Sequence, residues 1–156
     1  MVFSDGYVKL SDFDVSIQLK KDVQCTFKCG TTEYFAPEMA VGAECKKTVD
    51  MWALGVLAYQ LSSFEFPFDA ELIDDGERFV EVAEESERHR NWHDPTISYE
   101  LKDLINRLLR AEPRGRLGVS GWKSIKNHNF FKMAQFNWNA LELKAMDSPL
   151  LPIISR

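Results

Sequence analysis

Asp12 is the first residue of the chain whose type and position could bind a metal ion. It follows Tyr7-Val8-Lys9-Leu10, which has the pattern of a short strand, and it precedes a long polar segment. Many phosphoryl-transfer enzymes hold magnesium at such a place, because carboxylate oxygens suit that hard cation. A single Asp-Phe pair is weak evidence, however, and a solvated aspartate at a strand end is the simpler interpretation.

Three further motifs follow Asp12 in order along the chain. They are Gly30-Thr31-Thr32-Glu33-Tyr34-Phe35-Ala36-Pro37-Glu38, Asp50-Met51-Trp52-Ala53-Leu54-Gly55-Val56 and Leu108-Leu109-Arg110-Ala111-Glu112-Pro113-Arg114-Gly115-Arg116-Leu117. The first ends in the Ala-Pro-Glu signature of a kinase activation segment. The second resembles the kinase central-helix motif, and the third resembles the late kinase motif that supplies an arginine. Four matches in this order make chance a poor explanation, so the chain resembles the protein kinase family.

The end of the chain narrows this resemblance to the AGC group of serine/threonine kinases, which contains the cyclic-nucleotide-dependent kinases. The similarity rests on His128-Asn129-Phe130-Phe131, Phe136-Asn137-Trp138-Asn139-Ala140-Leu141 and Pro149-Leu150-Leu151-Pro152. These segments resemble the end of the AGC catalytic domain and the start of its C-terminal tail. The resemblance implies a partial kinase domain over residues 1–131 and an AGC-like tail segment over residues 132–156.

The resemblance assigns nucleotide and substrate roles to three residues. Asp12 resembles the aspartate that chelates magnesium on the nucleotide phosphates, and Ser11 would lie at the floor of the nucleotide pocket. Thr31 resembles the threonine that positions the catalytic aspartate and the substrate hydroxyl. The segment from Cys29 to Tyr34 would form the pocket for the residue after the phospho-acceptor.

Five further residues belong to the activation segment or to its support. Thr26 is a candidate phosphorylation site, and Thr32 replaces a proline that is common in relatives. Glu38 and Arg116 resemble the ion pair that holds the activation segment to the helical lobe. Asp50 resembles the central-helix aspartate that hydrogen-bonds the catalytic loop.

Several groups that phosphoryl transfer needs are missing from the 156 residues. A glycine-rich loop, a strand lysine, a helix glutamate and a His-Arg-Asp catalytic loop ending in Asn are the kinase elements that hold ATP and activate the substrate. The chain has none of them, and Asp14 stands where the metal-binding motif has Gly. ATP and magnesium are therefore expected in the full-length family, but this chain is expected to bind neither well and to be inactive alone.

Three interpretations of function remain open, and two of them rest on the kinase resemblance. The chain is either a fragment of an AGC-like serine/threonine kinase or a non-catalytic, pseudokinase-like interaction module. Met1 falls inside a predicted strand, which favours a truncated product. An unrelated helical binding domain is a third alternative. A Gly-rich loop and a His-Arg-Asp motif in the preceding coding sequence would favour the fragment.

The composition is ordinary for a soluble globular protein. The net charge is -5, which argues against nucleic acid or an anionic membrane as the main partner. No apolar run reaches the roughly 18 residues of a membrane span, and the first ten residues lack a signal-peptide pattern. The three cysteines lack zinc-site spacing. The chain is expected to be intracellular, in the cytoplasm or nucleus. The kinase resemblance implies a protein substrate or partner.

The periodicity predicts a mainly α fold that resembles the C-terminal lobe of a kinase. A helix over 49–61 is apolar on nearly every side and should lie at the centre of a helical bundle, with Thr48 as its cap. Amphipathic helices are predicted over 77–89 and 101–109, the latter capped by Ser98, and a short helix over 122–126. A small β-hairpin, Met1–Phe3 with Tyr7–Leu10, and a long activation-segment loop over 16–32 precede them.

One weakness follows from the resemblance. Helices that precede the catalytic loop in a kinase are missing, so the face of the central helix that carries Trp52 and Tyr59 is expected to lose its cover. Exposed apolar patches of this kind favour self-association. The chain is therefore expected to be marginally stable.

Overall fold

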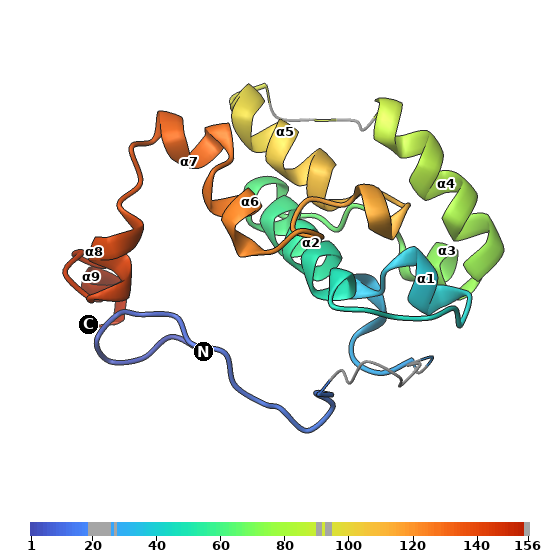
Figure 1. Cartoon of the computed structure of the whole chain (residues 1–156), viewed down its shortest axis with the longest axis horizontal. Coiled ribbons are helices and arrows are strands. Elements are labelled where there is room, and N and C mark those ends of the chain that lie inside the picture. Colours follow the sequence, from blue (N-terminus) through green and yellow to red (C-terminus); the bar gives the residue numbers. More distant parts are fainter. Residues whose placement is uncertain (19–25, 27, 90–91, 93–94, 155–156) are drawn as a thin grey trace. The chain divides into compact units, whose positions relative to one another are not determined.

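The computed structural model describes residues 1–18, 26, 28–89, 92 and 95–154, which are mainly helical (Figure 1). The chain forms two compact units: Met1–Ile17 with Gln135–Arg156, and Gln18–Ala134. The larger unit contains the 3₁₀ turns η1 (Thr32–Tyr34) and η2 (Pro113–Gly115) and the helices α1 (Pro37–Ala40), α2 (Thr48–Ser63), α3 (Ala70–Asp74), α4 (Gly76–His89), α5 (Tyr99–Leu108), α6 (Trp122–Lys126) and α7 (Asn129–Met133). The smaller unit contains α8 (Trp138–Glu142) and α9 (Leu151–Ile154).

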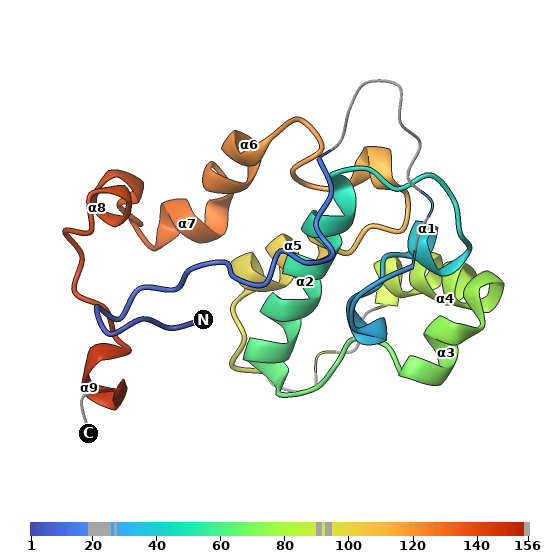
Figure 2. The same ribbon diagram turned by 90° about the horizontal axis from the view of Figure 1, so that it is seen from below.

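Helix α2 is the centre of the larger unit, as predicted for the apolar segment 49–61. It runs beside α5 in both views of the chain (Figures 1 and 2). The two helices approach closely at Gly55, where an added Cβ would lie 2.8 Å from Leu109 Cδ2 and 2.9 Å from Leu108 Cβ. A glycine is needed here because any side chain would push α5 away.

Trp52 of α2 is the middle of an aromatic cluster. Its ring stacks on Phe68 with centroids 5.7 Å apart and meets the edge of Phe79 of α4 at 6.0 Å. Phe68 and Phe79 also contact each other, at 5.2 Å. Offset and edge-to-face aromatic pairs are more favourable than their buried area alone suggests. This cluster joins α4 to α2.

The prediction that Trp52 and Tyr59 lose their cover is wrong. Trp52 is 0% exposed and Tyr59 is 6% exposed, because Phe68 and Phe79 cover the first and Trp92 packs on the second at 5.2 Å. The exposed apolar side chains of α2 lie on its other side, where Leu61 is 71% exposed. Positions 52, 56 and 59 share one helix face, whereas 54, 58 and 61 share the opposite one.

The predicted helix boundaries agree with the structure better than the predicted caps do. Helices α4, α5 and α6 match the segments 77–89, 101–109 and 122–126 within two residues. The Ser98 cap is confirmed, since its hydroxyl accepts a hydrogen bond from Leu101 N at 3.2 Å. The Thr48 cap is wrong: Thr48 is the first residue of α2, the N-cap position belongs to Lys47, and no side chain caps this end.

The predicted β-hairpin is reduced to one bridge. Among the described residues the only β pairing is an isolated antiparallel bridge between Val2 and Val8, so neither strand forms. Backbone hydrogen bonds still close the turn, from Phe3 N to Tyr7 O and from Gly6 N to Phe3 O. A two-stranded hairpin is at best marginally stable without further strands. Much of the predicted loop over 16–32, residues 19–25 and 27, lies outside the described residues.

None of the helices in the described part of the chain is both long and apolar enough to cross a membrane.

His128 caps helix α7 with its ring. Its Nδ1 accepts a hydrogen bond from Phe130 N at 3.2 Å, and its Nε2 lies 3.1 Å from Asp103 Oδ2 on α5. The Nδ1 contact requires a neutral ring with its proton on Nε2, which then donates to the carboxylate. Burial lowers the pKa of His128 below its usual value of 6.5, and the negative charge of Asp103 opposes this shift without cancelling it.

This cap predicts a pH dependence of stability. Because the folded chain binds the His128 proton less readily than the unfolded chain, the contribution of the neutral ring is present above the unfolded pKa and is lost as pH falls through the folded pKa. His128→Asn keeps an oxygen acceptor at the N-cap but removes the titration. Between about pH 8 and 5, urea unfolding should show a smaller loss of stability for this variant than for the natural chain. Equal losses of stability in the two proteins would contradict the role of His128 as the titrating cap of α7.

Candidate functional site

The segment Thr31–Glu38 joins a 3₁₀ turn to a short helix and lies on α2. The turn η1 is closed by hydrogen bonds from Tyr34 N to Thr31 O and from Phe35 N to Thr32 O. Tyr34 fixes it to the helix, since its hydroxyl donates to Gln60 Oε1 at 2.8 Å and its ring meets Phe66 edge-on. Tyr34 therefore attaches the turn η1 to α2.

Helix α1 places Glu38 toward the core. Pro37 occupies the first turn of α1, where its missing N–H costs no hydrogen bond. Ala36 before it and Glu38 after it are both buried. The backbone carbonyl of Glu38 accepts from Ala43 N at 2.8 Å, which closes the chain around the end of the helix. These local features bring a carboxylate into the protein interior, where it needs a partner.

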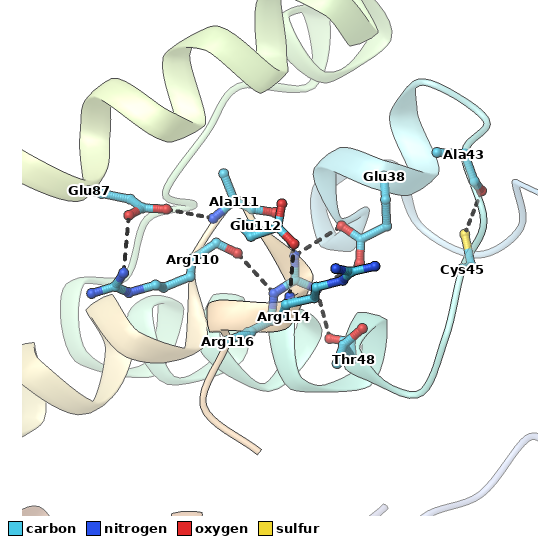
Figure 3. Close-up of polar contacts among 10 residues, drawn as sticks. All are labelled: Glu38, Ala43, Cys45, Thr48, Glu87, Arg110, Ala111, Glu112, Arg114 and Arg116. Carbon is cyan, nitrogen blue, oxygen red and sulfur yellow. Dashed lines mark hydrogen bonds and ion pairs between the residues drawn. The ribbon is translucent and has the colours of Figure 1, made fainter. Parts of the chain in front are cut away.

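Arg116 is that partner, and its guanidinium uses all five N–H donors (Figure 3). Nη1 and Nη2 donate to the two oxygens of Glu38 at 2.8 and 2.9 Å, which makes the ion pair bidentate. The remaining donors bind three carbonyls: Nη1 to Thr48 O at 2.8 Å, Nη2 to Ala111 O at 3.1 Å and Nε to Arg110 O at 2.9 Å. Arg116 is 0% exposed, so its charge is removed from water but fully hydrogen-bonded.

The loop after α5 is built to place Arg116. Glu87 of α4 accepts a hydrogen bond from Ala111 N at 2.8 Å, and its other oxygen lies 4.0 Å from Arg110 Nη1 (Figure 3). The carboxylate of Glu112 accepts from Arg114 N at 3.2 Å and caps η2. Leu117 N donates to Arg107 O at 2.8 Å, which closes the loop on α5. The guanidinium carbon of Arg116 also lies 5.2 Å from the centre of the Trp52 ring.

The Glu38–Arg116 pair acts as a structural connection. It links α1, the start of α2 and the loop after α5, which are far apart in sequence. Because both side chains are buried, neither can reach a substrate in solvent. Their role is structural: the ion pair fixes the Thr31–Glu38 segment on α2. Sequence reasoning brought these two residues together, but it missed the three carbonyls that complete the site.

Asp50 lies in the first turn of α2. Partial burial raises the pKa of its carboxyl. Within the described residues, no hydrogen bond or ion pair to its side chain is found. The sequence-based role of Asp50, a hydrogen bond to a catalytic loop, therefore stays a prediction.

Ser11 and Asp12 belong to the smaller unit and are both exposed. Asp12 has a left-handed backbone conformation, with a φ of 63°, which a non-glycine residue rarely adopts. Magnesium needs an octahedral set of oxygens, taken from one or two carboxylates, phosphates and waters. In the part of the chain described here, no group of three His, Cys, Asp or Glu residues could hold a metal ion. The roles of Ser11 at a nucleotide pocket and of Asp12 as a magnesium ligand therefore stay predictions.

The three threonines of the predicted activation segment lie in the larger unit. Thr26 is exposed, and the residues on either side of it lie outside the described residues. Thr31 is the N-cap residue of η1 but makes no side-chain cap hydrogen bond, and Thr32 begins the turn. The positioning role of Thr31 and the phosphorylation of Thr26 stay predictions.

Comparison with known proteins agrees with the resemblance of the motifs. The family model described as the protein kinase domain matches residues 1–131. The chain is 34% identical over 154 residues to protein kinase C delta type of Rattus norvegicus. It is 34% identical over 150 residues to the serine/threonine-protein kinase YPK2/YKR2 of Saccharomyces cerevisiae and 34% identical over 150 residues to the serine/threonine-protein kinase gad8 of Schizosaccharomyces pombe. These alignments cover 97%, 96% and 96% of the chain but only 21%, 21% and 25% of the three relatives.

Proposed function

Because this chain belongs to the protein kinase family, we propose that it supplies the helical, C-terminal part of an AGC-like serine/threonine kinase catalytic domain. Residues 1–131 are the partial catalytic domain in this proposal, and residues 132–156 are the start of an AGC-like tail. In a full-length relative the corresponding region works with ATP and magnesium to phosphorylate serine or threonine in protein substrates. By itself, the chain does not transfer phosphate.

The observation that carries the proposal is the buried, bidentate pair of Glu38 and Arg116. It fixes the Ala-Pro-Glu end of the activation segment to the helical core, which is the role that the motifs imply. Tyr34 fixes the other end through Gln60. A chain that holds this segment in place keeps the surface on which a kinase positions its protein substrate.

The absence of activity follows from what the 156 residues do not contain. They include no glycine-rich loop, no strand lysine and no His-Arg-Asp loop, so phosphate positioning and hydroxyl activation both lack their groups. Asp12 adds one carboxylate, and Asp14 beside it adds a negative charge that would repel nucleotide phosphates. We also propose that the chain acts inside the cell, because the kinase reaction uses ATP.

A non-catalytic interaction module is the second candidate. It is favoured by an apolar groove of about 380 Å³ on the larger unit. The groove lies over α2, α5, α6 and α7 and is lined by Leu54, Ala58, Leu61, Ser62, Leu101, Leu104, Leu108, Ile125, Phe130 and Phe131. Exposed apolar patches mark sites where a partner protein or a second copy of the chain binds.

A single-turnover assay tests the absence of activity. Purified chain incubated with radiolabelled ATP, magnesium and a basic peptide should transfer no phosphate to the peptide or to itself. Asp12→Ala is the matched control, because it removes the one candidate metal ligand and leaves the helical core unchanged. Label that persists through purification and disappears in Asp12→Ala would overturn this part of the proposal.

A further inference from the structure

The smaller unit is held together around Ser148. The turn at Gly6 lies directly against this serine: a Cβ added to Gly6 would come within 2.6 Å of Ser148 Cβ. Gly6 has a φ of +76°, which glycine adopts without strain. The Ser148 hydroxyl donates to Gly6 O at 2.6 Å and accepts from Leu150 N at 3.2 Å. The Ser148 hydroxyl therefore connects the N-terminal turn to the C-terminal segment of the smaller unit.

Two further contacts hold the same turn. The hydroxyl of Tyr7 donates to Met146 O at 2.8 Å and accepts from Met146 N at 3.2 Å. Lys144 Nζ lies 2.6 Å from Asp5 Oδ2 in an exposed ion pair, which contributes little because water screens it. The turn is thus attached by a few polar contacts. Small, partly exposed units of this kind open with low free energy.

Ser148 is also the only serine or threonine in the 156 residues that is followed by proline. Proline-directed kinases select a hydroxyl followed by proline, because their pocket for the next residue accepts a ring without a backbone N–H. The proline also restricts Ser148 to extended backbone conformations, which are the conformations that kinases bind. The hydroxyl that holds the turn thus has the sequence context of a phosphorylation site.

We propose that Ser148 is the phospho-acceptor of a proline-directed kinase and that its phosphorylation releases the Met1–Leu10 turn from the C-terminal segment. Ser148 Oγ attacks the γ-phosphorus of ATP held by the modifying kinase. The new Oγ–P bond replaces the bond from that phosphorus to ADP, and the hydroxyl proton passes to the base of the kinase. This inference is independent of the function proposed above, since this chain is here the substrate.

Phosphorylated Ser148 cannot keep its contact with Gly6, for three physical reasons. Phosphorylation removes the proton that Ser148 donates to Gly6 O. Ser148 Oγ already lies 2.6 Å from Gly6 O, so the three added oxygens would crowd the turn. A phosphate carries a charge of about -1.5 to -2, and Asp5 and Asp147 are neighbours of Gly6 and Ser148 in sequence. The modified serine therefore favours the open state, and the kinase captures the chain when the turn opens.

Mass spectrometry tests the first half of the proposal. The whole chain is incubated with ATP and a proline-directed serine/threonine kinase, such as a cyclin-dependent kinase. One phosphate should appear on Ser148 and should be absent from both Ser148→Ala and Pro149→Ala. A chain that takes no phosphate on Ser148, or takes it equally in Pro149→Ala, would overturn the proposal.

Hydrogen exchange tests the second half. The amides of Phe3, Gly6 and Lys9 donate within the turn, and their exchange should accelerate at least tenfold in the phosphorylated chain and slow again after phosphatase treatment. Ser148→Ala loses the hydrogen bond without added charge or bulk, so its acceleration should be smaller. Exchange in α2 is the internal control and should not change. Exchange at the turn that is unchanged or slower in the phosphorylated chain would contradict the release.

Discussion

Replacing Arg116 by methionine should lower the free energy of unfolding of the chain by about 3–5 kcal/mol. Methionine preserves much of the side-chain volume but removes the charge and all five donors. The carboxylate of Glu38 would then be buried without a partner, together with the carbonyls of Thr48, Ala111 and Arg110. The loss is measured by urea unfolding followed by circular dichroism. Domains are stable by only about 5–15 kcal/mol, so the variant should approach the limit of folding.

Two comparisons separate this pair from an ordinary ion pair. The exposed pair of Lys46 and Glu44, at 3.2 Å, is the matched control, and Lys46→Ala should cost no more than about 1 kcal/mol. The double variant Arg116→Met with Glu38→Leu should lose less than the sum of the two single losses, because neither charge is then left alone. Equal losses for Arg116→Met and Lys46→Ala would show that the buried pair does not hold the fold.

Replacing Trp52 by alanine should also cost about 3–5 kcal/mol. The Trp52 ring is buried against Phe68, Phe79 and the guanidinium of Arg116, so truncation leaves a cavity at the meeting point of α2 and α4. Trp52→Phe should cost less than the alanine change. In the described part of the chain, the indole Nε1 is the one buried side-chain nitrogen or oxygen without a hydrogen-bond partner, so phenylalanine loses no hydrogen bond.

Trp122 provides the matched control for this substitution. It begins α6 and is 59% exposed, so Trp122→Ala should change the free energy of unfolding by only about 0.5 kcal/mol. The measurement is the same urea titration for all variants. If Trp52→Ala unfolds at the same urea concentration as Trp122→Ala, the central position of α2 is refuted.

Helices and caps that depend on the spacing of nearby residues could be predicted from the sequence. The apolar segment 49–61 predicts a buried helix whatever covers it, and the i, i+3, i+4 spacing from Leu101 to Leu109 predicts α5. Ser98 is confirmed as a cap because capping depends on residues three apart. Glu38 and Arg116 could be paired only through the family resemblance, since 78 positions separate them.

Contacts between distant segments could not be predicted from the sequence. The prediction for Trp52 and Tyr59 failed because their cover comes from Phe68, Phe79 and Trp92, whose approach depends on how α3 and α4 fold back on α2. The Ser148 hydrogen bond to Gly6 spans 142 positions, and no pattern links them. The strand prediction failed because a short two-stranded hairpin is marginally stable without a further strand, even when its apolar and polar side chains alternate.

An exchange of this chain into a full-length relative tests the central claim most directly. Rat protein kinase C delta type aligns with 97% of the chain, so its matched segment can be replaced by residues 1–156 and the purified chimera assayed for phosphate transfer to a peptide. The proposal predicts transfer by the chimera and none by the chain alone. Asp12→Asn in the chimera should reduce transfer at least about 100-fold, since a metal contributes several kcal/mol to transition-state stabilisation. A chimera that folds cooperatively but transfers no phosphate would contradict the claim and favour the interaction module.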